Sequence, residues 1–300
     1  MEYHNIDLRM ERRGFRRFVS SWLLRDEGLD RTYLVDTGPS VSWPVLREAV
    51  ERFGGGRVDG VFLTHVHIDH AGAAALAVRE YGTPLFASER GVPHLLDPSA
   101  LWAGSVKTLG ETAHFYGKPE AVSADALRAM DRLPEGFSSV PTPGHAAHHQ
   151  SFAYDDPDRG RVLFAGEAAG VFLEGEEPAP YLRPATPPRF FPEVTVSSIN
   201  RLLDLKGTYI CYAHFGWSGD AEKMLTLALE QLNLWRGVVC ELLDGGVPPS
   251  DEEVFFQELM KRDALLGALR TMEPDIQERE REFIGNSISG FLGAYGRGGE

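Results

Sequence analysis

The sequence predicts an α/β fold with a helical extension at its C-terminal end. Up to about Gly216, short apolar runs of strand length alternate with segments of helical spacing and with polar loops that contain glycine. After Ser218 only helical patterns follow. The chain has 300 residues, of which 43% are hydrophobic and 25% charged, as in ordinary globular proteins. We therefore expect a core over residues 1–217 and a helical extension over residues 218–300.

The core is predicted to begin with a β-hairpin. Residues 18–24 and 32–36 are apolar runs on either side of an Asp-Glu-Gly turn. Residues 44–52 place their apolar side chains on one helical face, and three consecutive glycines end this helix. Residues 58–64 then read as a buried strand, and the Ala-rich residues 71–81 as a helix.

The middle of the chain is predicted to be mainly strands. Residues 91–134 have a less regular pattern, within which we expect a helix at residues 123–130. The remaining strands are expected at residues 84–88, 137–141, 150–154, 161–165 and 209–213.

Three helical segments are predicted for the extension, at residues 221–243, at 251–270, and from there to about Tyr295. Two prolines separate the first segment from the second, and Pro274 separates the second from the third.

The charge balance argues against a nucleic-acid partner. Thirty basic and 44 acidic residues give a formal net charge of −14. Binding to a phosphate backbone draws on clustered Lys and Arg side chains that displace counterions. We therefore expect no nucleic-acid partner.

The chain is expected to be a soluble, cytoplasmic protein. Its two cysteines, Cys211 and Cys240, are too few for a disulfide framework and fit a reducing compartment. The sequence opens without the basic start and apolar stretch of a signal peptide, and no apolar run reaches the roughly 18 residues that cross a membrane.

Three of the ten histidines lie within residues 65–70, in the string Thr64-His-Val-His-Ile-Asp-His-Ala-Gly72. Histidine and aspartate offer the nitrogen and oxygen donors that borderline divalent cations bind. His65 and His67, two residues apart, can converge on one ion, while Asp69 and His70 can address a second. The string follows a predicted strand and precedes a predicted helix, where α/β folds commonly place their chemistry.

His-x-His-x-Asp-His after a hydrophobic strand and a threonine resembles the signature of the metallo-β-lactamase superfamily. Further segments resemble the family in its order, over roughly residues 18–216. They are Asp36-Thr37-Gly38, which resembles the turn that supports the metal loop, and the loops around His145, Glu167 and His214. The resemblance implies a four-layer αββα sandwich.

The resemblance also implies a ligand set for two divalent metal ions. His65, His67 and His145 would hold one ion, while Asp69, His70 and His214 would hold the other. Residue 167 would bridge them. The family's usual bridging residue is Asp, and the extra methylene of Glu167 adds roughly 1.5 Å of reach. The alternative is that Glu167 only supports the site and that one ion binds tightly. Zinc is expected first, with iron and manganese as alternatives.

The other histidines are expected to be secondary. His148 and His149 are predicted to cap or pack in the loop after His145, with His148 able to hydrogen-bond within the site. His94 either lines a substrate pocket or packs in a loop. Trp235, Phe255 and Phe256 either cover the pocket or pack between helices.

By resemblance to the glyoxalase II-like branch of the family, we expect a metal-dependent hydrolase of small-molecule esters, thioesters or lactones. In such an enzyme a hydroxide shared by the two ions attacks the substrate, with Asp69 orienting it. One alternative is a mononuclear Fe(II) sulfur (persulfide) dioxygenase on the same fold; another is a non-catalytic metal-binding member. The amphipathic C-terminal helices offer a surface for a homodimer.

Overall fold

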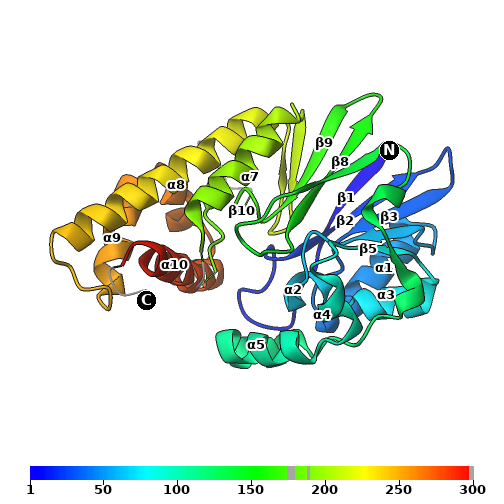
Figure 1. Ribbon diagram of the computed structural model, residues 1–300, viewed down its shortest axis with the longest axis horizontal. Helices are drawn as coiled ribbons and strands as arrows, with labels where there is room; N and C mark the ends of the chain where they lie inside the picture. Colours follow the sequence, from blue (N-terminus) through cyan, green and yellow to red (C-terminus); the bar gives the residue numbers. More distant parts are fainter. Residues whose placement is uncertain (174–179, 188–189, 297–300) are drawn as a thin grey trace.

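Two β-sheets face one another at the centre of the computed structural model, which describes residues 1–173, 180–187 and 190–296 (Figure 1). The first sheet has the strand order β1-β2-β3-β4-β5-β6, and the second has the order β13-β12-β9-β8-β7. A third, two-stranded sheet pairs β10 with β11. The strands span β1 Glu2–Asp7, β2 Ser20–Asp26, β3 Arg31–Val35, β4 Gly60–Phe62, β5 Leu85–Phe86, β6 Leu127–Arg128, β7 Phe137–Pro141, β8 Gln150–Asp156, β9 Gly160–Gly166, β10 Val171–Leu173, β11 Tyr181–Arg183, β12 Tyr209–Tyr212 and β13 Trp217–Ser218.

Side-chain alternation along the strands separates three layers of packing. In β4, Phe62 points between the two sheets, while Val61 packs with the helices on the outer face. In β9, Phe164 points between the sheets, while Leu163 packs on the opposite outer face. Because successive side chains of a strand point to opposite faces, both sheets carry apolar residues on both faces and need a cover on each side.

Helices supply these outer covers, so the core is the αββα sandwich that the resemblance implied. Helices α1, α3, α4 and α6 pack on the first sheet, and α7 and α8 pack on the second (Figure 1). The helices span α1 Trp43–Phe53, α2 Ile68–Ala71, α3 Ala74–Tyr81, α4 Val92–Leu96, α5 Ser99–Leu109, α6 Glu111–Tyr116, α7 Pro192–Asp204, α8 Ala221–Asp244, α9 Glu252–Arg262 and α10 Pro274–Tyr295, with short 3₁₀ helices at Ser40–Ser42, Ala124–Ala126, Met130–Arg132 and Ala264–Thr271.

The helix expected at residues 123–130 is wrong. The segment forms a 3₁₀ turn, Ala124–Ala126, and then β6, which pairs in parallel with β5 at the edge of the first sheet. Its alanine, leucine and methionine favour a helix, but pairing with β5 overrides that local preference. The irregular stretch before it contains α4, α5 and α6, and α7 lies in a segment for which no helix was expected.

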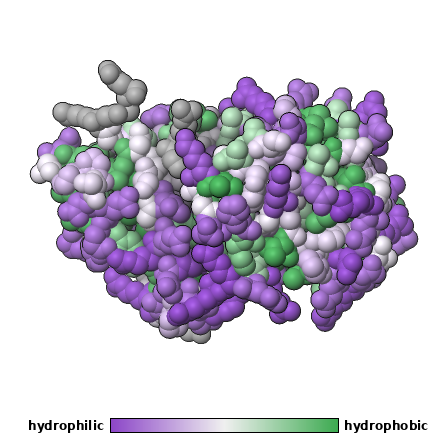
Figure 2. All heavy atoms as spheres, turned by 90° about the horizontal axis from the view of Figure 1, so that it is seen from below, coloured by the Kyte–Doolittle hydropathy of each residue, from purple (hydrophilic) through white to green (hydrophobic). Residues whose placement is uncertain are grey.

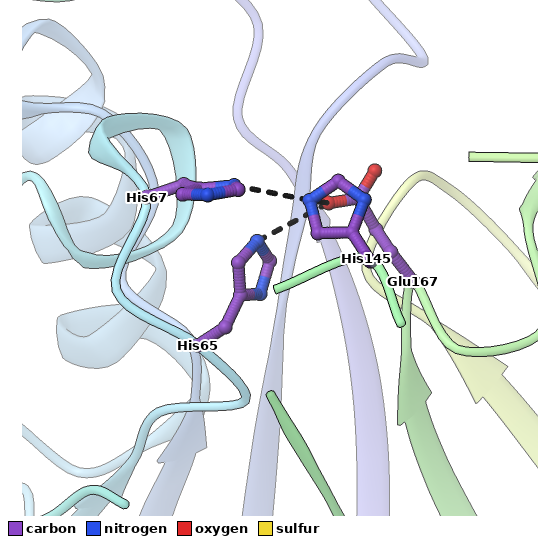
Figure 3. A group of neighbouring side chains, drawn as sticks. All are labelled: His65, His67, His145 and Glu167. Atoms are coloured by element: carbon purple, nitrogen blue, oxygen red, sulfur yellow. Dashed lines mark hydrogen bonds and ion pairs between the residues drawn. The ribbon is translucent and has the colours of Figure 1, made fainter. Parts of the chain in front are cut away.

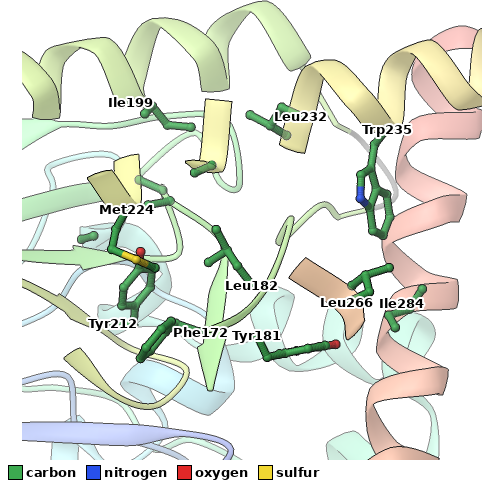
Figure 4. Packing of buried hydrophobic residues seen from close by; sticks show 14 of the residues in the cluster. Phe172, Tyr181, Leu182, Ile199, Tyr212, Met224, Leu232, Trp235, Leu266 and Ile284 are labelled. Carbon is green, nitrogen blue, oxygen red and sulfur yellow. The ribbon is translucent and has the colours of Figure 1, made fainter. Parts of the chain in front are cut away.

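The C-terminal helices continue the packing on the second sheet. Trp235 of α8, Phe255 of α9 and Ile284 of α10 are fully buried in one hydrophobic cluster that also contains Leu163 of β9. Figure 4 shows this cluster, with Trp235 facing Leu266 and Ile284. The first and third predicted helical segments form as α8 and α10, whereas the second divides at Asp263 into α9 and the 3₁₀ helix Ala264–Thr271. Pro274 stands at the first position of α10, where a missing N–H costs nothing. Among the described residues, no helix is long and apolar enough to cross a membrane.

Candidate metal centre

The seven predicted site residues come from four separate loops and meet at one end of the two sheets. Each loop follows or precedes a strand. His65 and His67 follow β4, and Asp69 and His70 lie in α2 directly after them. The other three are His145 between β7 and β8, Glu167 after β9, and His214 after β12. Their donor atoms form two groups, within each of which all atoms lie within 4.8 Å of one another.

The first donor group consists of His65, His67, His145 and Glu167 (Figure 3). His145 Nε2 lies 3.0 Å from His67 Nδ1 and 2.9 Å from Glu167 Oε2. His65 Nε2 lies 3.2 Å from the same carboxylate oxygen. Zinc bound tetrahedrally at 2.0–2.1 Å would separate its ligand atoms by about 3.3 Å, so these spacings suit donors that share one ion.

The second donor group consists of Asp69, His70 and His214. Asp69 Oδ2 lies 3.6 Å from His70 Nε2 and 3.8 Å from His214 Nε2. Glu167 reaches this group too, because its Oε2 lies 3.4 Å from His70 Nε2 and its Oε1 lies 3.3 Å from His214 Nε2. The Glu167 carboxylate thus lies between the two groups.

Hydrogen bonds from the ring Nδ1 atoms fix the tautomers of four histidines. His145 and His214 donate from Nδ1 to the carbonyl oxygens of Ala185, at 3.1 Å, and Phe18, at 3.0 Å. A carbonyl can only accept, so Nδ1 carries the hydrogen and Nε2 keeps its lone pair. This arrangement is the one that metal-ligating histidines adopt.

Asp36 fixes the other two of these four rings. Its carboxylate accepts from the Thr64 N–H at 2.7 Å, from the Thr64 hydroxyl at 2.8 Å and from His70 Nδ1 at 3.2 Å. Because the Thr64 hydroxyl donates to Asp36, it is left to accept from His65 Nδ1 at 3.0 Å. His65 and His70 therefore also present bare Nε2 atoms, whereas His67 presents Nδ1.

The donor set fits divalent metal ions. The Nε2 atoms of His65 and His70 are buried and have no partner in hydrogen-bond geometry among the described residues. Buried polar atoms without partners are costly in a folded protein unless something else binds them. Neutral imidazoles and carboxylates without thiolates form a set that suits zinc, iron and manganese.

The pKa shifts of the donor residues differ in direction. Burial, together with the neighbouring His70 and His67, lowers the pKa of His65 well below its usual value. Burial raises the pKa of Glu167, but His145 and His214 outweigh it and hold that pKa well below normal. Burial also lowers the pKa of His70, yet the carboxylates around it raise the pKa well above normal, because they make the surrounding potential negative.

Glycine and a strand irregularity let Glu167 take its position. The pairing of β12 with β9 shifts register beside Gly166, and Gly166 has φ +60°. A Cβ atom at Gly166 would meet His149 Nε2 at 2.5 Å, so only glycine fits. That same His149 nitrogen accepts the Glu167 backbone N–H at 3.0 Å. A bulge of this kind re-aims a strand end, which accommodates a glutamate.

The two histidines after His145 support the loops. His149 accepts from the Glu167 backbone, and burial lowers its pKa to about 3. His148 Nδ1 accepts the Val66 N–H at 3.2 Å, and burial lowers its pKa to about 4. Both rings are thus neutral acceptors at physiological pH. Sequence reasoning expected packing roles here but did not identify His149 as the partner of Glu167.

A cavity of about 600 Å³ opens onto both donor groups. His94 lines this cavity, which is one of the two roles expected for it. Trp235, Phe255 and Phe256 are buried in the helix packing and do not line the cavity. Helices α5 and α10 and the segment from Arg183 to Pro187 supply most of the remaining lining. Figure 2 shows that the face seen from below is mostly hydrophilic, with scattered hydrophobic residues. Sequence reasoning missed Arg183 and α5, which carry no motif.

Comparison with known sequences supports this description. The model of the metallo-beta-lactamase superfamily matches residues 14–214. The probable metallo-hydrolase YflN of Bacillus subtilis is 30% identical over 193 residues, which cover 58% of this chain and 70% of that protein. The metallo-beta-lactamase fold-containing protein ST1585 of Sulfurisphaera tokodaii is 26% identical over 170 residues, which cover 53% of this chain and 61% of that protein.

Solved structures show the same fold. The structure of ST1585, from Sulfolobus tokodaii, superposes with a TM-score of 0.61 at 24% identity, over 76% of this chain and 85% of that one. A metallo-beta-lactamase family protein from Thermus thermophilus superposes with a TM-score of 0.58 at 22% identity, over 81% of this chain and 83% of that one.

Proposed function

The chain belongs to the metallo-β-lactamase superfamily, and we propose that it is a metal-dependent hydrolase that cleaves an ester, thioester or lactone of a small molecule. The observation that carries the proposal is the placement of two donor groups, with Glu167 between them, at the wall of a cavity of about 600 Å³. A cavity of this size matches a small molecule rather than a polymer. The name of YflN, a probable metallo-hydrolase, agrees with this class.

In this proposal the first donor group holds one divalent ion, the second holds another, and Glu167 contributes to both. When bound, two such ions would lower the pKa of a coordinated water and polarise the acceptor oxygen of the substrate. Zinc is the first candidate, and iron and manganese suit the same donors.

Asp69 has a further role in the proposal. Its side chain is 18% exposed and lines the cavity, and it accepts no hydrogen bond from the residues that the structure describes. One carboxylate oxygen is therefore free to accept a hydrogen bond from the attacking water and to orient it toward the substrate. No serine or cysteine nucleophile is needed for this reaction.

The experiment loads the chelator-treated protein separately with zinc, manganese or iron and offers a panel of lactones, acyl thioesters and phosphodiesters. We expect about two equivalents of metal in protein purified without chelator, and turnover of at least one class of carbonyl ester. The proposal fails if no metal form cleaves any carbonyl ester. If the protein instead holds a single iron per chain and consumes oxygen in the presence of glutathione persulfide, it is the dioxygenase and not the hydrolase.

Glu167→Gln tests the bridging role. It keeps the length of the side chain but removes its charge. We expect the metal content to fall from about two equivalents to about one and kcat/KM to fall with it. Two equivalents retained with normal affinity would show that Glu167 does not contribute to both ions.

A further inference from the structure

Arg183 stands in the cavity wall beside the candidate metal centre. It ends β11, it lines the cavity, and only 3% of its surface is exposed. Its Nε donates to Glu280 Oε2 of α10 at 2.7 Å. The Phe283 ring, which also lines the cavity, lies 5.4 Å from the guanidinium carbon.

Glu280 is shared by a buried network of hydrogen bonds. Its Oε2 also accepts from the Tyr181 hydroxyl at 2.8 Å, and its Oε1 accepts from Arg279 Nε at 2.9 Å. The exposed fractions of Glu280 and Arg279 are 0% and 3%. The hydrogen-bonded network therefore contains two guanidinium groups and one carboxylate, and the nearest further carboxylates are Asp7 for Arg279 and, at the candidate metal centre, Glu167 for Arg183.

The two arginines differ in how many of their donors are used. The terminal nitrogens of Arg279 donate to the backbone carbonyls of Gly14, Arg16 and Arg17. Among the described residues, the terminal nitrogens of Arg183 donate to none; only its Nε has an acceptor. A guanidinium offers five N–H donors in a fixed plane. The terminal nitrogens of Arg183 are not among the fully buried atoms that lack a partner. The donors of Arg183 that lack a protein acceptor are on a group that lines the cavity.

The rest of the described cavity lining contains no acidic side chain to neutralise Arg183 except Asp69 and Glu167. Both of these belong to the donor groups. The other polar side chains of this wall are neutral, and they include Thr186, Asn286 and Ser289. Once metal ions occupy the donor groups, the cavity is positive at both its metal centre and its Arg183 wall.

We propose that Arg183 determines specificity by binding a carboxylate of the substrate, so that the preferred substrates are esters or thioesters with a carboxylate apart from the scissile bond. This inference rests on the proposed hydrolase function. The planar fork of a guanidinium matches the two oxygens of a carboxylate and binds it through charge-assisted hydrogen bonds. A single guanidinium, with no second Lys or Arg in the described lining, suits a carboxylate better than a phosphate dianion.

The test compares substrates that differ only in this charge. One pair is a hemiglutaryl thioester and its glutaramoyl analogue, in which an amide replaces the carboxylate on the acyl side. The other pair is the butanoyl thioester of 3-mercaptopropanoate and that of 3-mercaptopropanamide, which places the charge on the leaving group. For at least one pair, we expect kcat/KM to favour the carboxylate by about 10- to 100-fold.

Arg183→Lys should reduce this ratio about tenfold or more, because lysine keeps the charge beside Glu280 but lacks the fork. Arg279→Lys is the matched control. It alters the same buried network, away from the described cavity lining, and should leave the ratio within about twofold. A ratio near one in the unaltered protein for both pairs overturns the proposal, as does an equal loss of the ratio in both variants.

If no ester is cleaved, the proposed hydrolase function is wrong, but a binding experiment still tests whether Arg183 binds a carboxylate. Calorimetry on the metal-loaded protein then compares glutarate with glutaramate, which has the same size and one carboxylate fewer. Affinity for glutarate at least tenfold higher, and lost in Arg183→Lys but not in Arg279→Lys, supports the carboxylate site. Equal affinities for the two compounds overturn it.

Discussion

The inner and outer walls of the cavity are built in different ways. On the inner side, His65, His70, Glu167 and His214 are at most 7% exposed, and the three histidines donate from Nδ1 to protein acceptors. On the outer side, α5 lines the cavity although none of its residues is buried. The inner wall belongs to the loops at the strand ends of the two large sheets, whereas the outer wall is formed by α5, α10 and the end of β11 with the segment after it. The difference suggests that the fold fixes the chemistry and that the outer wall sets the choice of substrate.

The comparison predicts the largest loss of activity when a histidine of the inner wall is removed. His145→Ala removes one donor of the first group and should reduce kcat/KM by about 10³-fold or more, since a bound ion contributes several kcal/mol to the transition state. Metal content measured by mass spectrometry should fall in parallel. His114→Ala, at an exposed histidine of α6, is the control and should change neither. Full activity of the His145→Ala variant would show that His145 is not needed for the reaction.

A second prediction concerns Glu280 of α10, which joins α10 to β11 in the outer wall. Burial raises the pKa of Glu280, but Arg183 and Arg279 outweigh it and lower that pKa from 4.5 to about 2. Because the folded-state pKa is depressed, the ionised carboxylate stabilises the protein above pH 4.5, and this contribution is lost as the pH falls toward 2.

Glu280→Gln should therefore lower the free energy of unfolding near pH 7 by about 3 kcal/mol, the equivalent of the shift. Urea denaturation from pH 7 to pH 3 should show the gap between the two proteins narrowing below pH 4.5. A gap that stays constant across this range would mean that Glu280 gains no stabilisation from the arginines.

The third prediction tests the hydrogen bonds that hold the inner wall. Asp36→Asn keeps the shape and tolerates the left-handed backbone of this residue, at φ +59°, but replaces one acceptor oxygen with an NH₂ group. It should lower metal affinity by about 10- to 100-fold, because Asp36 orients His70 directly and His65 through Thr64.

Competition with a chromophoric chelator measures that affinity. Asp59→Asn is the matched control, since Asp59 also accepts a backbone N–H, that of Thr32, but lies outside the described cavity lining. Equal losses in the two variants would point to general destabilisation rather than to the orientation of His70.

The smallest effect is expected on the outer side. His94 lines the cavity outside both donor groups and lies 6.0 Å from the His148 ring. His94→Ala should change kcat/KM by less than about threefold, under 1 kcal/mol, and leave the metal content unchanged. Steady-state kinetics on the best substrate of the panel checks this. A 100-fold loss of kcat/KM would show that His94 takes part in the reaction, and the two walls would then not differ in the way described above.

Local residue patterns by themselves determined much of the core. The patterns predict an α/β core with helices after it, and the β2–β3 hairpin, α1, α8 and α10 form near their predicted positions. The four-layer arrangement was implied by the resemblance, not by these patterns. The string from His65 to His70 predicts convergence on metal because donors this dense in sequence are close in space wherever the chain folds. The structure brings His145, Glu167 and His214 to the same place, as the resemblance implied.

Only the tertiary structure decided which ring nitrogen each histidine presents and what lines the outer wall. The first depends on acceptors distant in sequence, such as the Phe18 carbonyl for His214 and the Ala185 carbonyl for His145. The second depends on α5, β11 and α10 meeting around one cavity, with Glu280 holding Arg183 from 97 positions away. Local patterns record the preferences of neighbouring residues, whereas these contacts exist only after the sheets and helices have packed.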